Sequence, residues 1–432
     1  MAAERRGLMS SNPSMNNPGA LREQKFRLDE DLHIKLAEPA LKRNPLTPRG
    51  EPLTLPDPGF PQHPERKTTV MSEKEYQRVQ RMLTIKAWGL PYAKSRWYAK
   101  QLRPIVGYLF TEYKCNLDCH YCWAYNNTVK GMTEDTAKRS IDWLEDIGCR
   151  VLALMGGEPL LRWPFVHKVT DYAAKKGFFV YLATNGRLLR PKVIDRLGDS
   201  GLAVINLAVD SVDERPELPK ALNPIKENFE YMVKMQRHYG YVSFLNINIT
   251  RINIDDVKEL TEIGRSYNLA TDYHINESPM MEQEHFKHQD ENSTFITPED
   301  YPKIDALIDW LIDKHDQGYK MPNPKEQLAN MKNMMRGSVE PWPCRAGQNT
   351  LIIREDGTLA PCFPMYGASH DWGQVESPSF DLVQLDEMKE SCNTTCFSTL
   401  NSIVGHCYNN ARILKWIGKQ AKNRFRGVTG SI

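Results

Sequence analysis

Runs of apolar residues, each about the length of a strand, alternate with amphipathic helical stretches between residues 104 and 280. The runs are nearly continuous in apolar side chains, which is typical of parallel strands covered by helices. Strands and helices that alternate in this way predict βα repeats and an α/β fold. The six predicted strands are residues 105–110, 151–155, 178–184, 202–209, 242–249 and 271–276.

The helical stretches between these strands carry start signals. In TEDTAKRSIDWLEDIG, Thr133 is placed to cap the helix, and Glu134 and Asp135 follow in the first turn. One face of this helix is apolar, with Ala137, Ile141, Leu144 and Ile147. A closed barrel of eight repeats needs about 250 residues, whereas the six repeats here occupy roughly 175. The predicted fold class is therefore a partial (β/α)6 parallel barrel that stays open.

The chain before the barrel divides into two parts. Residues 1–68 hold ten of the chain's 28 prolines and many polar residues. Such a segment buries too little apolar surface to offset the entropy lost on ordering, so an extended arm is predicted. Residues 69–103 are predicted as a helical lead-in, with helical patterns near 72–86 and 91–102.

After the barrel the pattern changes again. Residues 281–337 are predicted as a helical connector, with a capped helix in TPEDYPKIDALIDWLIDKHDQ and another near 324–336. Residues 338–432 are predicted as a small α+β module, because TLIIREDGTLAPCF forms two strands around an Asp356-Gly357 turn. Its tail, ARILKWIGKQAKNRFR, is a basic amphipathic helix, which is either a solvated face or a docking surface for anionic lipid or another acidic partner.

Composition and charge limit the function classes. The chain has 432 residues, 41% of them hydrophobic, and a net charge of +2, which does not favour nucleic-acid binding. No run reaches the roughly 18 apolar residues of a membrane span, and the N-terminus lacks the apolar stretch of a secretory signal. We expect a cytoplasmic protein, in which the nine cysteines are metal or redox ligands before they are disulfides.

Three of these cysteines lie in one short loop, CNLDCHYC, directly after the first strand. Cys115, Cys119 and Cys122 are soft thiolate donors at the edge of the barrel where active sites gather. A structural zinc ion needs a fourth ligand, and His120 lies awkwardly between two of the cysteines. An iron–sulfur cluster held by three cysteines would instead leave one iron open for an exchangeable ligand.

A second motif follows the second strand, in LMGGEPLLR. Gly156 and Gly157 would let the backbone approach a ligand closely, and Glu158 places a carboxylate at the same edge of the sheet. Further polar residues lie at later strand ends, namely Thr184 and Asn185 at the third strand, Asp210 and Ser211 at the fourth, and Asn248 at the fifth. Asp, Ser and Asn at these positions are equally suited to capping the helices that follow.

CNLDCHYC together with GGEPLL, in a half-open βα barrel, resembles the radical S-adenosylmethionine (radical SAM) superfamily over about residues 104–280. The resemblance implies that the three cysteines hold a [4Fe–4S] cluster whose free iron binds the amino and carboxylate groups of S-adenosylmethionine. It implies that the backbone of Tyr121 meets the adenine and that Glu158, beside Gly156 and Gly157, accepts a hydrogen bond from the ammonium group. It also implies that Asp210, Ser211 and Asn248 bind the ribose and the carboxylate.

The chemistry implied by this resemblance begins with one electron, from a donor such as flavodoxin or ferredoxin. Cleavage of S-adenosylmethionine then gives a 5′-deoxyadenosyl radical, which abstracts a hydrogen atom from a substrate. The cofactor carries the chemistry, and the protein supplies orientation and electrostatics.

A second group of cysteines lies in the C-terminal module. The pattern resembles the auxiliary-cluster module of SPASM and Twitch radical enzymes, and it implies one further [4Fe–4S] cluster, because the full SPASM pattern has seven cysteines and this region has five. The implied ligands are Cys344, Cys362, Cys392 and Cys396, with Cys407 as a rival for the last position. A structural zinc site is the alternative. Cys149 stands alone and is predicted to be a buried structural thiol.

The substrate is left open by the sequence. The absence of a recognisable peptide-recognition domain favours a small-molecule or lipid substrate, and the alternative is a peptide maturase. An alternative of another class is a non-catalytic iron–sulfur electron carrier or a zinc-binding protein. A cluster of His274, Glu277, His285 and His288 after the sixth strand is predicted either to shape the substrate pocket or, more simply, to belong to a loop and the start of a helix.

Overall fold

The computed structural model describes residues 70–97, 101–122, 129–275, 293–366, 371–379 and 381–392, together with residues 396, 398, 401, 402, 404 and 405. The predicted N-terminal arm, the basic C-terminal helix and Cys407 lie outside the described residues. So do Glu277, His285 and His288.

Six strands form the centre of the molecule, and each pairs in parallel with the next strand along the chain. Their bounds agree with the predicted apolar runs to within one or two residues at nearly every end. The α/β fold with a parallel sheet is confirmed. The strands are β1 (Val106–Glu112), β2 (Val151–Gly156), β3 (Phe179–Thr184), β4 (Val204–Ala208), β5 (Val242–Ile249) and β6 (Ala270–Ile275).

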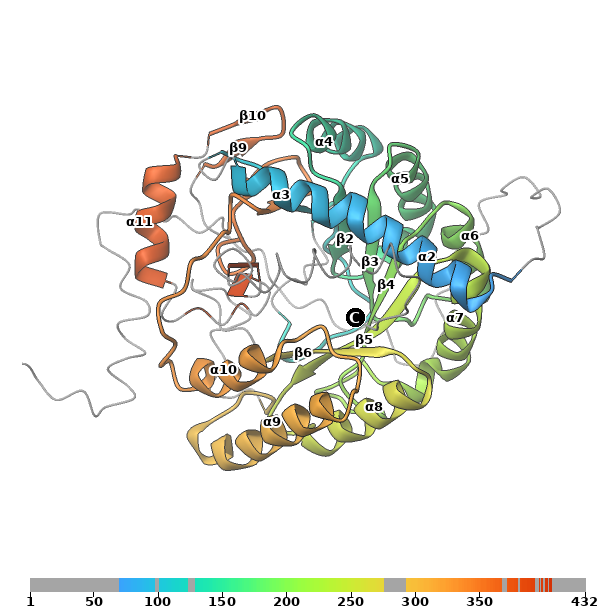
Figure 1. The fold of residues 1–432 in the computed structure, drawn as a ribbon, viewed down its shortest axis with the longest axis vertical. Coiled ribbons are helices and arrows are strands. Elements are labelled where there is room, and N and C mark those ends of the chain that lie inside the picture. Colours follow the sequence, from blue (N-terminus) through green and yellow to red (C-terminus); the bar gives the residue numbers. More distant parts are fainter. Residues whose placement is uncertain are drawn as a thin grey trace, which may run out of the picture.

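Helices surround these strands on the outside (Figure 1). Thr133 caps the first of them as predicted, because its side chain accepts a hydrogen bond from the backbone N–H of Thr136. The main hydrophobic core lies between the outer face of the sheet and this layer of helices. The helices are α4 (Glu134–Asp146), α5 (Trp163–Lys175), α6 (Pro191–Asp199), α7 (Lys226–Tyr239) and α8 (Ile254–Ser266), with short 3-10 turns η2 (Pro159–Arg162) and η3 (Asn223–Ile225).

The N-terminal lead-in crosses the ring of strands (Figure 1). It consists of α2 (Glu73–Thr84), a π-helical turn η1 (Ile85–Gly89) and α3 (Leu90–Trp97), so the two predicted helices are joined without a break. The ring of Trp88 lies 6.3 Å from that of Phe179, the first residue of β3. The lead-in therefore covers the amino-terminal end of the barrel and leaves the carboxyl ends of the strands on the other side.

The segment after β6 first covers one edge of the sheet. A 3-10 turn η6 (Pro298–Asp300) leads into α9 (Tyr301–Asp316), and α10 (Lys325–Met335) packs on α9. Asn323, between these helices, pairs with the backbone of β6: its Oδ1 accepts from the N–H of Tyr273 at 2.8 Å, and its Nδ2 donates to the carbonyl of Tyr273 at 3.0 Å. A side chain thus satisfies backbone groups that an edge strand would leave open.

The C-terminal segment adds two strands at the opposite edge. β7 (Thr350–Ile353) pairs in parallel with β1, and β8 (Leu359–Ala360) returns antiparallel to β7. The predicted hairpin is confirmed, and Gly357 adopts the φ of +92° that its turn requires. The sheet therefore runs β6-β5-β4-β3-β2-β1-β7-β8. The remaining elements are β9 (Gly373–Gln374), β10 (Ser377–Pro378) and α11 (Leu382–Cys392).

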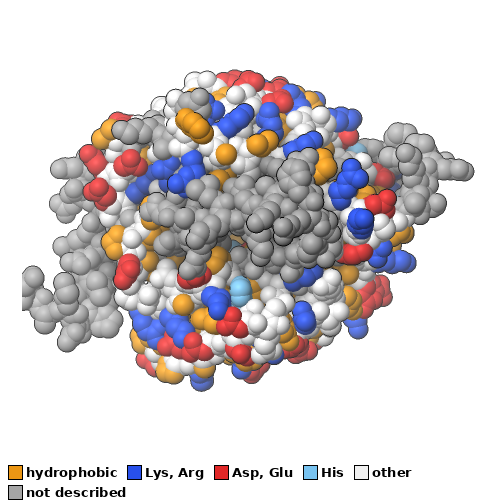
Figure 2. Space-filling view, in the orientation of Figure 1, with side chains coloured by type: hydrophobic (Ala, Val, Ile, Leu, Met, Phe, Trp, Pro, Cys, Tyr) orange, Lys and Arg blue, Asp and Glu red, His pale blue; other side chains and the backbone are white. Residues whose placement is uncertain are grey.

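Acidic and basic side chains are interspersed over the described surface on the face shown in Figure 2. Within the described ranges, no helix has the length and apolar character needed to cross a lipid bilayer.

Candidate functional site

The three-cysteine loop leaves β1 at its carboxyl end. Cys119 is buried, and Cys115 and Cys122 are half-buried. Burial raises the pKa of the Cys115 thiol, and negative charge on Glu158 and on the other two thiols raises it further, so the three sulfur atoms lie close enough to interact. A bound cation lowers the pKa of such a thiol, and iron is a suitable cation for thiolate donors.

The two glycines of GGEPLL hold this loop in place. A Cβ on Gly156, whose φ is +151°, would overlap the carbonyl oxygen of Glu112, and a Cβ on Gly157 would overlap that of Lys114. The N–H of Gly157 donates to the Glu112 carbonyl at 2.7 Å, and the N–H of Glu158 donates to the Lys114 carbonyl at 2.8 Å. The sequence predicted that these glycines approach a ligand. The structure shows that they first approach the backbone at the start of the cysteine loop.

Glu158 is fully buried, and its carboxylate already has three donors from the protein. Its Oε1 accepts from the N–H of Leu160 at 2.9 Å and from the Thr184 hydroxyl at 2.8 Å, and its Oε2 accepts from the N–H of Asn185 at 2.8 Å. Burial raises the pKa of Glu158, and these hydrogen bonds lower it in part. The carboxylate therefore joins the ends of β2 and β3, and one lone pair of Oε2 is left for the expected ammonium group.

Asn185, at the end of β3, faces the cysteine loop. Its Nδ2 donates to the Asn116 side chain at 2.9 Å and points to the sulfur of Cys115 at 3.9 Å. Its own Oδ1 accepts from the N–H of Arg187 at 3.0 Å, which fixes the orientation of the amide. A neutral donor near a thiolate stabilises the charged form of the sulfur.

Tyr121 and Asp210 form a hydrogen bond that joins the loop to the end of β4. The second oxygen of Asp210 accepts from the N–H of Asn248 at 2.8 Å. Asp210 is almost completely buried, and this burial raises its pKa. Ser211 makes a different contact, because its hydroxyl donates to the carbonyl of Leu218 at 3.2 Å within the following loop. The structure thus brings Tyr121, Asp210 and Asn248 together and directs the hydroxyl of Ser211 to that loop.

Lys220 was not singled out by the sequence, and it is a prominent charge of the site. Its ammonium group lies 5.1 Å from the centre of the Tyr121 ring. Burial lowers the pKa of Lys220, but charge on Cys119, Asp210, Cys122 and Cys115 acts in the opposite direction, and the net effect is a raised pKa. A half-buried cation therefore lies beside the cysteine loop. No motif surrounds Lys220, so only the spatial neighbourhood reveals it.

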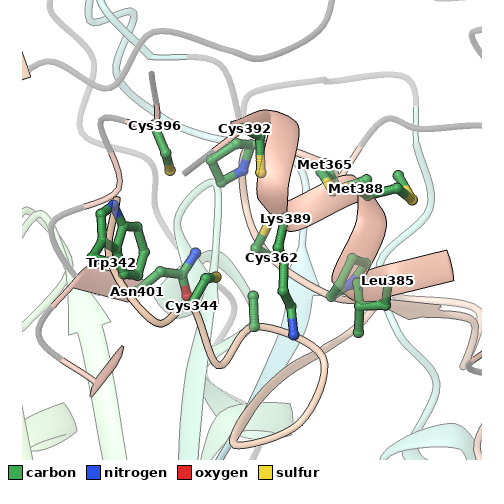
Figure 3. Close-up of a pocket in the computed structure, with 13 residues that line it drawn as sticks. Trp342, Cys344, Cys362, Met365, Leu385, Met388, Lys389, Cys392, Cys396 and Asn401 are labelled. Atoms are coloured by element: carbon green, nitrogen blue, oxygen red, sulfur yellow. The ribbon is translucent and has the colours of Figure 1, made fainter. Parts of the chain in front are cut away.

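The second cysteine group surrounds one cavity (Figure 3). Its members come from four places: Cys344 precedes β7, Cys362 follows β8, Cys392 ends α11, and Cys396 comes shortly after. None of the four is in a disulfide. Most other residues that line the cavity are apolar, as Met365, Leu385 and Met388 are, and Lys389 lies among them.

The pKa values of these thiols are raised by burial and by their mutual proximity. A positively charged group bound among them would stabilise the thiolate forms. Burial raises the pKa of Cys392 to about 12, and it raises that of Cys362 further because the charges of the other three cysteines add to it. Within the described ranges no group of three or more His, Cys, Asp or Glu side chains is arranged to hold a single metal ion. The chemistry of the set, four sulfur donors around one apolar cavity, fits a group that offers a separate iron to each thiolate.

The remaining predicted positions are simpler. Cys149 is fully buried, and its thiol donates to the carbonyl oxygens of Val151 at 3.3 Å and Ile105 at 3.5 Å, so the prediction of a structural thiol is confirmed. His274 lies in β6, and its Nε2 is 3.2 Å from a carboxylate oxygen of Asp272, a residue that carries no motif in the sequence.

Comparison with known proteins agrees with this arrangement. A family model described as the radical SAM superfamily matches residues 111–263. The AdoMet-dependent heme synthase of Methanosarcina barkeri is 29% identical over 165 residues, which are 37% of this chain and 47% of that protein. The Fe-coproporphyrin III synthase of the same organism is 29% identical over 120 residues, 27% of this chain and 30% of that protein. The chain therefore spans less than half the length of these curated relatives.

Among solved structures, SuiB of Streptococcus suis bound to its precursor peptide SuiA is similar, with a TM-score of 0.51 and 15% identity. The match covers 68% of this chain and 67% of that one. At this identity the likeness concerns the fold alone. The family match includes the cysteine loop and the GGEPLL segment beside it, so residues 111–263 are similar in sequence to the radical SAM superfamily.

Proposed function

We propose that this protein is an enzyme that binds S-adenosylmethionine at a [4Fe–4S] cluster held by Cys115, Cys119 and Cys122 and acts on a non-peptide substrate. One observation supports the proposal above all others. The backbone of GGEPLL is hydrogen-bonded to the start of the three-cysteine loop, at the carboxyl ends of the barrel strands. When bound, this group supplies the one-electron reduction of S-adenosylmethionine that yields a 5′-deoxyadenosyl radical.

The chain's own residues would position the cofactor. Glu158 has one carboxylate lone pair left for the ammonium group of S-adenosylmethionine, and Tyr121 would offer its backbone to the adenine. The ribose would lie near Asp210, Ser211 and Asn248. Lys220 would pair with the carboxylate of S-adenosylmethionine, because a cation held beside the thiolates is suited to that anion.

We further infer that Cys344, Cys362, Cys392 and Cys396 hold an auxiliary [4Fe–4S] cluster, with Cys407 as a rival for one position. Their common cavity supports this inference. An electron carrier such as flavodoxin or ferredoxin would reduce the enzyme. The domain plan in this proposal is an arm at 1–68, a lead-in at 69–103, the barrel at 104–280, a connector at 281–337 and the auxiliary module at 338–432.

A non-peptide substrate is supported by the names of the curated relatives, which are heme and coproporphyrin synthases. A lipid is one possible member of this substrate class, because the sequence predicts a basic amphipathic helix at the C-terminus. A peptide maturase is the alternative, and its support is the fold shared with SuiB. A non-catalytic iron–sulfur carrier or a zinc protein is the alternative of another class.

Electron paramagnetic resonance of the anaerobically reconstituted, reduced protein tests the proposal. We expect S-adenosylmethionine to change the signal of one cluster, because only the three-cysteine site offers an open iron. The variant Cys115→Ala should lose this response together with about four irons per chain. A signal that is identical with and without S-adenosylmethionine in iron-replete protein would favour the electron carrier, and bound zinc without iron would favour the zinc protein.

A further inference from the structure

We propose that Tyr181, Asn206 and Asp272 form a substrate-binding layer on the inner face of the barrel and that this layer takes a positively charged nitrogen group of the substrate. The inference rests on the proposed function, since it names the substrate chemistry of the same barrel. It concerns three strands, β3, β4 and β6, which the motifs of the cysteine loop do not include.

The side chains of this layer point to the inside of the barrel. Alternate residues of a strand face opposite sides, and the outward residues of β3, β4 and β6, such as Leu182, Ile205 and Tyr273, belong to the core beneath the helices. Tyr181 instead packs with the inner hydrophobic cluster, where its ring lies 6.0 Å from that of Phe244.

Asn206 is opposite Phe244 in the register of β4 and β5, and Asp272 is opposite Asn246 in the register of β5 and β6. Asp272 therefore lies on the same inner face as Asn206, two residues further along the register, and a hydrogen bond joins Asn206 to Tyr181. The charge of Asp272 adds to burial in raising the pKa of Tyr181, which agrees with this proximity.

Two acceptor oxygens of the layer have no hydrogen-bond partner among the residues that the structure describes. Asn206 is 6% exposed, and its Nδ2 donates to the Tyr181 hydroxyl while its Oδ1 accepts no hydrogen bond. Asp272 has one oxygen 3.2 Å from Nε2 of His274, and its Oδ1 is buried without a partner. Buried acceptors without donors destabilise a folded protein, and such groups are most easily explained by a ligand that donates to them.

The charge of the layer selects the kind of donor. Asp272 is a carboxylate whose side chain is 14% exposed, and among the described residues its ion-pair partner is His274. A carboxylate and an amide oxygen together suit an ammonium or guanidinium group, which donates several hydrogen bonds and neutralises the charge. An anionic group would be repelled by these two acceptor oxygens, because neither can donate a hydrogen bond to it.

The layer also lies next to the cofactor site. His274 is one inward-facing position further along β6 than Asp272, and a charge on His274 acts on Asp210, the residue that binds Tyr121 of the cysteine loop. If Asp272 binds the substrate nitrogen, the rest of the substrate would extend towards the carboxyl ends of the strands, where the cofactor is proposed to bind.

Titration calorimetry of the reconstituted enzyme with three probes tests the proposal. The probes are n-hexylammonium, n-hexanol and n-hexanoate, which share one chain and differ in the head group. We expect hexylammonium to bind most tightly, and Asp272→Asn and Asn206→Leu to weaken it at least tenfold. The control variant is Asp255→Asn, which removes an exposed carboxylate on α8 and should bind the probe as wild type does.

A second measurement uses the melting temperature without any ligand. If Asp272 is held for a substrate, Asp272→Asn should raise the melting temperature by about 2 °C or more, because the variant removes the charge of a largely buried carboxylate. A lower melting temperature would mean that Asp272 is a structural partner of His274 and would overturn the proposal. Tighter binding of hexanoate than of hexylammonium, or equal affinity in wild type and Asp272→Asn, would overturn it too.

Failure of this inference is distinguishable from failure of the proposed function. Probe binding is measured without turnover, whereas the proposed function is decided by the response of the wild-type cluster to S-adenosylmethionine. Wild-type protein with that response and no preference for the cation would retain the function and reject the substrate class.

Discussion

At the scale of single residues, the backbone of Gly157 lies against the carbonyl oxygens of Tyr113 and Lys114, where a side chain has no room. Gly157→Ala should displace the start of the cysteine loop, so we expect less than half of the wild-type iron at the three-cysteine site and loss of S-adenosylmethionine binding. Iron analysis and calorimetry check this. Gly89→Ala is the matched control, because a Cβ at Gly89 meets no atom within 4 Å. Full iron and normal affinity in Gly157→Ala would contradict this account of the glycine pair.

Lys220 supplies positive charge beside the cysteine loop. Lys220→Gln should weaken binding of S-adenosylmethionine about tenfold or more, because one charge-assisted hydrogen bond is worth about 1.5–3 kcal/mol. Lys220→Arg should recover part of the affinity, since it keeps the charge. Iron content is measured alongside, so that loss of cofactor affinity is separated from loss of the cluster. Equal affinity in wild type and Lys220→Gln would remove Lys220 from the site.

Cys149 predicts a pH dependence of stability. Burial raises the pKa of its thiol from an ordinary value of 9.0 to about 12, so the folded protein holds the proton where the unfolded chain loses it. The stability that this thiol contributes is present below pH 9 and is lost as the pH rises towards 12. The stability advantage of wild type over Cys149→Ala in urea should shrink by about 1.4 kcal/mol between pH 8 and pH 10. A constant difference between the two proteins would contradict a buried, protonated thiol.

At the scale of elements, β7 covers the edge of β1 with four registered residue pairs, from Val106–Thr350 to Leu109–Ile353. A chain that ends at residue 337 would expose the backbone of β1 as an open edge, so we expect it to aggregate. Size-exclusion chromatography with light scattering checks this. The full-length variant Cys344→Ala/Cys362→Ala is the control, because it loses two of the proposed cluster ligands and keeps β7. A monomeric, folded truncation would show that β7 is dispensable.

The elements also show what the sequence can and cannot predict. The six barrel strands were predictable because continuous apolar runs bounded by capped helices are a local signal, as around Thr133. The hairpin at Asp356-Gly357 was predictable for the same reason. The pairing of β7 with β1 was not, because it joins segments some 240 residues apart and local patterns carry no register between them. Lys220 was missed because its role depends on a fold contact and not on its neighbours in sequence.

At the scale of the whole molecule, two cysteine groups are connected through one pair of aromatic residues. Tyr113, two residues before Cys115, shares a hydrogen bond with Tyr366, four residues after Cys362. The Tyr113 ring also lies 4.6 Å from that of Phe110 in β1. The segment that carries Cys362 is thus in contact with the residues that lead into the cysteine loop, which brings the two cysteine groups into one packed structure.

The auxiliary group predicts a defined loss of iron. Cys344→Ala/Cys362→Ala removes two of four thiolates around the second cavity, so we expect roughly half of the iron to be lost, as one of two clusters would be. Cleavage of S-adenosylmethionine without substrate should stay detectable, because the three-cysteine loop is unchanged. Iron analysis and chromatography of the products check both outcomes. Full retention of iron would mean that these cysteines do not hold a cluster.

We propose that the three-cysteine loop supports reductive cleavage of S-adenosylmethionine. The most direct test of this proposal is anaerobic incubation of reconstituted, iron-replete protein with dithionite and S-adenosylmethionine, followed by quantification of 5′-deoxyadenosine. We expect 5′-deoxyadenosine from wild type and none above background from the triple variant Cys115→Ala/Cys119→Ala/Cys122→Ala. Iron-replete wild-type protein that forms no 5′-deoxyadenosine would contradict it.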